Sequence, residues 1–281
     1  MPKVTYTNER GQSVMLGDSA PLLVTRFDGI GSVYNEILRQ KAPYQDGSTV
    51  TGGTLAEREL TIEGSILAPD KDTYRRQLLQ AFNPKLGGTL RYEKGSVVKE
   101  IECITELAPA FPSNFSVNHQ VFLITLLCPK PFWLDIETET DEIVTWIGGM
   151  SFPLRLPTIY ATKGPKLINI INQGDVETPA RIEFKGPATN PRITNQTTGE
   201  YIQVNRSLLN TDKLIITTDF GAKRVEIEDE SGSRINAFNW IDLGSTFWSL
   251  QVGDNVVEYS SDDQVEPAAV FVSYRNRYIG I

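Results

Sequence analysis

The segment from Gly174 to Ile202, GDVETPARIEFKGPATNPRITNQTTGEYI, decides the fold class of this chain. Apolar and charged side chains alternate strictly along residues 180–185, the period-two pattern of a strand with one buried and one solvated face. Gly186-Pro187 ends that strand, and Thr198-Gly199 marks a turn before a second strand. The segment therefore predicts two strands of a sheet with one wet face.

The remainder of the second half also has the pattern of short strands separated by turns. Short apolar or alternating runs recur at roughly 8–14-residue spacings, with turn residues between them. About eight strands result, and nothing here predicts a helix longer than a turn. The runs outside the opening segment are 167–171, 214–217, 225–227, 247–250, 256–259 and 268–274. We therefore expect an antiparallel β-sandwich in the C-terminal half.

The first half predicts a β-rich domain with one α-helix. Alternation around residues 59–66, 90–92 and 100–103 is typical of strands. Between the first two runs, Tyr74, Leu78 and Phe82 form an i, i+4, i+8 stripe. Asp70 or Asp72 can cap the start of this helix, and Asn83-Pro84 ends it.

Two segments of the first half admit alternatives. Residues 32–41 fit either one face of a helix or an extended arm. The run VFLITLL, Val121–Leu127, has apolar residues at both odd and even positions, which point to opposite faces of a strand. A strand with one solvated face should not show this pattern. Both of its faces must be covered, either by this domain's own helix or by another copy of the chain.

The chain length and a segment rich in proline and glycine indicate two domains. A chain of 281 residues exceeds the usual size of one domain. Prolines and the Gly148-Gly149 pair interrupt regular patterns between Cys128 and Lys166. We expect domains at 1–140 and 141–281, with residues 141–165 as the linker of the second.

The composition of the chain excludes several classes of function. The longest apolar run is far shorter than the ~20 residues that a membrane-spanning helix needs, and the N-terminus has no apolar secretion core. The sequence therefore predicts a protein made in a cytoplasm and not inserted in a membrane. A net charge of −8 opposes specific binding to nucleic acid phosphates. Cys103 and Cys128 match no zinc spacing and are expected to be buried free thiols.

No catalytic, metal or cofactor site is expected. His119 is the single histidine, and it has no evident nucleophile or metal-ligand partners. The acidic run 135–141 has calcium-like spacing but lacks the glycine turn and the distal glutamate. Trp240, Trp248 and Tyr259 would form a sugar platform if exposed, although such large aromatic residues more often fill a sandwich core.

Several motifs resemble the siphophage distal tail protein family, whose members belong to the tail tips of long-tailed bacterial viruses. In the second half these motifs are KGPATNP (185–191), TTGEYI (197–202), LQVGDN (250–255) and YRNRYIGI (274–281). In the first half, FNPKLGGTLRYE (82–93) and CPKPFWLD (128–135) match more weakly. None of these motifs is catalytic.

The resemblance implies a structural protein of the virion tail tip, not an enzyme. It implies a homo-hexameric ring built by the N-terminal domains, with outward C-terminal sandwiches of galectin-like or carbohydrate-module-like type. The implied partners are the tail tube protein, the tail-associated hub or fibre protein and, in some phages, receptor-binding proteins. It also favours the extended form of residues 32–41.

Under this reading, Phe122, Ile124 and Leu126 are expected at the interface between copies. The alternative function is a carbohydrate-binding adhesin module that attaches the virion to the host cell wall. A galectin-like sandwich would suit that role by analogy of fold alone.

Overall fold

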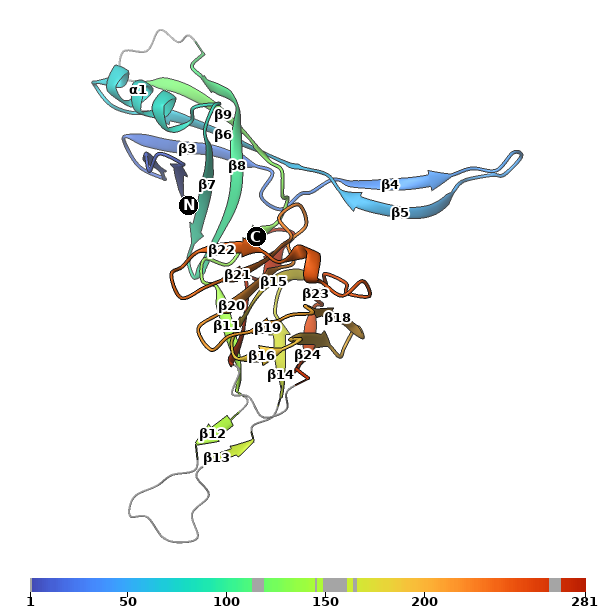
Figure 1. Cartoon of the computed structure of the whole chain (residues 1–281). Coiled ribbons are helices and arrows are strands. Elements are labelled where there is room, and N and C mark those ends of the chain that lie inside the picture. Colours follow the sequence, from blue (N-terminus) through green and yellow to red (C-terminus); the bar gives the residue numbers. More distant parts are fainter. Residues whose placement is uncertain (1, 113–118, 145, 149–160, 164–165, 263–268) are drawn as a thin grey trace. The chain divides into compact units, whose positions relative to one another are not determined.

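The computed structural model describes residues 2–112, 119–144, 146–148, 161–163, 166–262 and 269–281 (Figure 1). The chain forms two compact units, Met1–Ile136 with Tyr278–Ile281, and Glu137–Arg277. These are called unit 1 and unit 2. The described residues are mainly β, in antiparallel sheets, with a single α-helix.

Unit 1 is built on one large antiparallel sheet with the strand order β2-β1-β7-β8-β9-β6-β3. Its strands are β1 Lys3–Asn8, β2 Ser13–Leu16, β3 Leu22–Asp28, β6 Arg58–Ile66, β7 Gly87–Lys94, β8 Val97–Ala110 and β9 Gln120–Cys128. The short strand β10 (Trp133–Leu134) pairs with β8 and with β26 (Arg277–Tyr278). A separate hairpin consists of β4 (Asn35–Gln40) and β5 (Thr49–Leu55).

The helix α1 (Lys71–Ala81) lies where its sequence stripe predicts. Asp70 caps it, because its carboxylate accepts the Thr73 backbone N–H at 3.3 Å. Leu78 and Phe82 are fully buried in the core of unit 1, and the ring of Phe82 stacks on Tyr6 with centroids 4.3 Å apart. The apolar stripe therefore anchors this helix to the sheet.

The described part of unit 2 contains two main antiparallel sheets. The larger has the order β11-β25-β15-β20-β21-β22, with β23 also paired to β15, and the smaller has the order β14-β24-β17-β18. Their strands are β11 Glu139–Val144, β14 Leu167–Asn172, β15 Thr178–Lys185, β17 Arg192–Asn195, β18 Glu200–Gln203, β20 Lys213–Thr217, β21 Arg224–Glu228, β22 Arg234–Asn236, β23 Ser249–Leu250, β24 Gly253–Ser260 and β25 Ala269–Tyr274. The minor elements are the pairs β12 (Trp146–Gly148) with β13 (Ala161–Lys163) and β16 (Ala188–Thr189) with β19 (Ser207–Leu208), and the 3-10 turn η1 (Phe238–Trp240).

The two sheets of unit 2 enclose one core. Alternate residues of the larger sheet, such as Ile182 and Phe184, share a buried cluster with Ile193 and Tyr259 of the smaller one. Phe184 and Tyr259 meet across the layers with ring centroids 5.8 Å apart. The predicted alternation of residues 180–185 is the burial pattern observed along β15, and the unit is a two-layer sandwich.

The chain divides differently from the expected boundary at residue 140 in two respects. Residues 139–144 form β11, which pairs along its whole length with β25, so residues 141–144 of the expected linker belong to a sheet strand. The last four residues belong to unit 1, because β26 pairs with β10. Residues 149–160 of the expected linker lie outside the described residues.

Candidate functional site

The three residues expected at an interface between copies are interior residues. Phe122, Ile124 and Leu126 are all fully buried in the core of unit 1. Phe122 lies opposite Gly64 on β6, where an added Cβ would come within 2.3 Å of the Phe122 ring. That expectation is therefore corrected: these side chains offer no surface to a neighbour, because this parity of β9 faces the unit's own core.

The other parity of β9 carries apolar side chains toward the opposite face of the sheet. Val121, Leu123 and Leu127 are partly exposed there. Leu127 pairs with Ile104 of β8, which is 43% exposed, and Leu107 of β8 is 68% exposed. We call Ile104, Leu107, Leu123 and Leu127 the outer strip of unit 1.

The β4–β5 hairpin is called here the arm (Figure 1), and it is a second place where apolar side chains are exposed. All six residues of β4 and all but the last of β5 are exposed. The exposed hydrophobic residues in or beside the arm are Tyr34, Ile37, Leu38, Tyr44 and Val50. Residues 32–41, which the sequence left open between helix and arm, are thus mostly strand.

Arg58 holds the base of the arm, and nothing in the sequence singled it out. Its side chain is buried at the start of β6, and burial lowers the pKa of its guanidinium. It donates to the backbone carbonyls of Gly29, Ile30, Ser32, Pro131 and Ile279. Trp133 adds a bond from Nε1 to the Ile30 carbonyl at 3.0 Å. The chain entering the arm is therefore fixed from within unit 1.

The expected sugar platform does not form. Trp248 and Tyr259 are both 1% exposed and belong to the core of unit 2. Trp240 is partly buried, and the guanidinium of Arg206 lies 3.8 Å from the centre of its ring. The correction has a simple cause: the two layers need large aromatic residues between them, and these three supply part of that filling.

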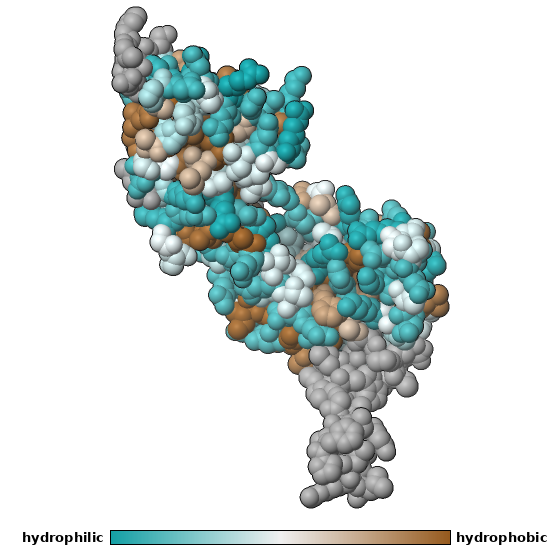
Figure 2. Space-filling model, turned by 90° about the vertical axis from the view of Figure 1, so that its left-hand side faces the viewer, coloured by the Kyte–Doolittle hydropathy of each residue, from teal (hydrophilic) through white to brown (hydrophobic). Residues whose placement is uncertain are grey.

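Other aromatic residues of unit 2 do reach the surface. Phe220 is 87% exposed, and Phe238 stacks on Phe247 with ring centroids 5.6 Å apart. The ammonium of Lys223 lies 5.3 Å from the Phe247 ring centre and 5.8 Å from that of Phe220. We call these four side chains the aromatic cluster of unit 2. Figure 2 shows that apolar patches interrupt a largely hydrophilic surface on the face it presents.

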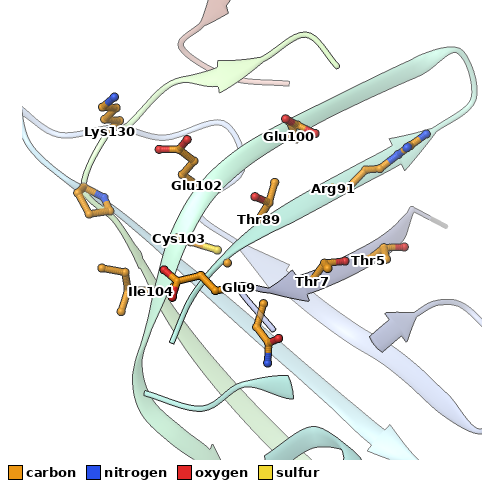
Figure 3. A pocket seen from close by; sticks show the side chains of 14 residues that line it. Thr5, Thr7, Glu9, Thr89, Arg91, Glu100, Glu102, Cys103, Ile104 and Lys130 are labelled. Carbon is orange, nitrogen blue, oxygen red and sulfur yellow. The ribbon is translucent and has the colours of Figure 1, made fainter. Parts of the chain in front are cut away.

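A groove of about 830 Å³ lies over β1, β7 and β8 of unit 1 (Figure 3). Cross-strand pairs on its floor join Thr7 to Thr89 and Arg91 to Glu100. Glu9 and Glu102 also line it. The groove brings together hydroxyls, carboxylates and cations, with Cys103 also in its lining, and we assign it no reaction.

The remaining candidate ligands have separate partners. Nε2 of His119 lies 2.8 Å from the Ser65 hydroxyl. Asp135 pairs with Lys99, whereas Glu139 accepts the Tyr274 hydroxyl at 2.8 Å. Within the described residues no group of three or more potential ligands could hold a metal ion, and no helix is long and apolar enough to cross a membrane.

Two family models match the chain, one in each unit. The phage tail protein RIFT-related domain matches residues 9–128, and the C-terminal domain of siphovirus-type tail components matches residues 173–278. No curated relative matches. The chain belongs to the siphophage distal tail protein family. It is a phage tail component, as the sequence motifs suggested.

Solved structures share the fold. The chain resembles the Dit protein (gp 19.1) of phage SPP1, described as a paradigm of the hub adsorption apparatus in phages that infect Gram-positive bacteria. The match has 14% identity, a TM-score of 0.67, and 98% of each chain covered. Chains of the phage P2 baseplate, in its activated conformation with calcium and with strontium, match with 11% and 10% identity and TM-scores of 0.53 and 0.52, over 100% of both chains.

Proposed function

We propose that this protein forms a homo-hexameric ring at the virion tail tip, which joins the tail tube protein to the tail-associated hub or fibre protein. Unit 1 builds the ring and unit 2, a galectin-like or carbohydrate-module-like sandwich, is the outer domain that receptor-binding proteins would contact. The protein would be made and assembled in the host bacterial cytoplasm. The observation that carries this proposal is the exposed, apolar arm, held at its base by Arg58.

An isolated two-stranded hairpin is marginally stable in water, so an arm of this kind needs a surface to cover it. Its exposed hydrophobic side chains include Ile37, Leu38 and Val50. The outer strip is a matching surface on the same unit, again with exposed leucine and isoleucine side chains. The arm of one copy and the outer strip of the next would make a heterologous contact, the kind that closes into rings.

The ring predicts a specific loss of assembly. Ile37→Asp with Leu38→Asp places two charges in the arm, and Leu107→Asp places one in the outer strip. Each variant should dissociate the hexamer into monomers, measured by light scattering and native mass spectrometry over a range of concentrations. A variant that carries the arm and the outer-strip substitutions together should lose less assembly free energy than the sum of the two separate losses. The reason is that both sets of substitutions remove the same contact.

Leu243→Asp is the matched control, since Leu243 is fully exposed in unit 2 and belongs to neither surface. It should leave the hexamer intact. A wild-type chain that stays monomeric at every concentration, or arm variants that assemble normally, would refute the ring.

The second candidate function is a carbohydrate-binding adhesin, now based on the aromatic cluster of unit 2. Aromatic faces are common sugar contacts, and Phe220 is largely exposed. Binding of the full chain to cell-wall polysaccharide, lost in Phe220→Ala and kept in Leu243→Ala, would support the adhesin. Equal binding by both variants would reject the cluster as a sugar site.

A further inference from the structure

The two cysteines of the chain face each other across two strands. Cys103 lies on β8 and Cys128 is the last residue of β9. The ladder between these strands pairs Ile104 with Leu127, so the next position outward pairs Cys103 with Cys128. Both side chains are buried, at 2% and 0% exposure, and both belong to the core of unit 1. They therefore share a face of the sheet as well as a register position.

This placement fits the geometry of a disulfide bond. Directly opposed residues of an antiparallel ladder have Cα atoms about 4.5–5.5 Å apart. Disulfides bridge Cα atoms about 4.4–6.8 Å apart. The strands therefore need no large movement to accept the bond.

The two thiols are free and buried in the structure. The side-chain hydrogen bond with Cys128, and then burial, raise the pKa of Cys103. Because the thiolate is the form that reacts, the buried Cys103 is slow to react in the folded chain. Cys103 is also one of the residues that line the groove over β1, β7 and β8, together with Pro129.

The position of the pair gives the bond a structural effect. Beyond it, the β8–β9 ladder shifts register between Thr105 and Leu107 and again between Leu107 and Ala110. The cysteines thus lie at the end of the ladder where the pairing is regular. A covalent bond there would hold β8 to β9 and close a loop of about 25 residues, which restricts the unfolded chain.

We propose that Cys103 and Cys128 form an intramolecular disulfide when the protein meets a small-molecule disulfide oxidant such as oxidised glutathione. One cysteine thiolate attacks the S–S bond of glutathione, forms a mixed disulfide and releases one glutathione thiolate. The second cysteine thiolate then attacks the protein sulfur of the mixed disulfide and releases the second. The two protein thiols are oxidised, the glutathione S–S bond is reduced, and the two thiol protons end on the two released glutathiones.

The test compares the folded with the unfolded chain. The full-length protein is equilibrated in buffers of graded reduced-to-oxidised glutathione ratio, with and without denaturing guanidinium chloride. Free thiols are then blocked by alkylation, and the Cys103–Cys128 species is quantified by peptide mass spectrometry. Each equilibrium is approached from the reduced chain and from a chain oxidised while unfolded and then refolded, so that slow access cannot imitate a negative result.

We expect the disulfide to form at a glutathione ratio at least tenfold more reducing in the folded chain than in the unfolded one. A disulfide that forms more readily in the folded than in the unfolded chain must stabilise the folded state. The oxidised protein should therefore melt at a higher temperature than the reduced protein. Cys103→Ala and Cys128→Ala should each show no shift in melting temperature on oxidation, because neither variant can form the intramolecular disulfide.

A folded chain that oxidises no more readily than the unfolded chain, or an oxidised protein that melts below the reduced one, would overturn the proposal. Either result would mean that the two strands reject the bond.

Discussion

At the scale of single residues, Arg58 shows how a buried cation can organise a surface feature. A buried arginine is usually paired with a carboxylate, but the acceptors around Arg58 are backbone carbonyls from three separate stretches of chain. Each carbonyl contributes a partial negative charge, and together they satisfy the guanidinium donors. The consequence is that residues 29–32, which lead into the arm, are tied to β6.

Replacing Arg58 should therefore cost stability and loosen the arm. Arg58→Met leaves several carbonyls unpaired, and we expect a loss of about 3–5 kcal/mol in the free energy of unfolding. Guanidinium chloride denaturation measures this loss, and limited proteolysis should show faster cleavage within 35–55. Arg91→Met removes a half-exposed arginine that pairs with Glu93 and should change stability by less than about 0.5–1 kcal/mol. Equal effects of the two substitutions would contradict the role given to Arg58.

At the scale of elements, the contribution of α1 depends on the face a residue occupies. Leu78 is fully buried against the sheet, whereas its neighbour Leu79 is 43% exposed. The two leucines have the same helix propensity, so any difference between them comes from packing. They form a matched pair for measuring how much the helix is stabilised by the core.

Leu78→Ala should lower the free energy of unfolding of unit 1 by about 2–5 kcal/mol, since it removes buried methyl groups and leaves a cavity. Leu79→Ala should cost less than about 1 kcal/mol. Urea denaturation followed by circular dichroism gives both values. Similar losses for the two variants would mean that α1 is not anchored by its predicted stripe.

At the scale of the whole molecule, the described residues form two hydrophobic cores that share no residue. Unit 1 builds its core between one sheet and the helix, and unit 2 builds its core between two sheets. Each core has the size that a domain needs to fold cooperatively. This organisation predicts two unfolding transitions.

Differential scanning calorimetry should resolve those transitions, and core substitutions should assign them. Leu78→Ala should lower the melting temperature of one transition by several degrees, and Ile182→Ala that of the other. Ile182 is fully buried in the core of unit 2. A single transition that both substitutions shift equally would show that the units unfold as one body.

The sequence predicted the elements well wherever local patterns decide them. The alternation along residues 180–185 requires a two-faced strand, and the stripe at Tyr74, Leu78 and Phe82 requires a helix with one buried face. The family motifs, which lie in both units, also indicated a tail component. Candidate surfaces were predicted poorly, because the sequence does not show whether a hydrophobic residue lies inside a core or on an exposed arm.

What the sequence by itself determined is the helix and those strands with a clear alternation, the mainly β class and the family, since periodicity and motifs are local properties of the chain. Only the tertiary structure decided which face of β9 meets the core. It turned Phe122, Ile124 and Leu126 inward and exposed the arm. It also brought Cys103 opposite Cys128 and Arg58 beneath the arm. Strand register and long-range packing join residues far apart in the chain, and no local pattern encodes those pairings.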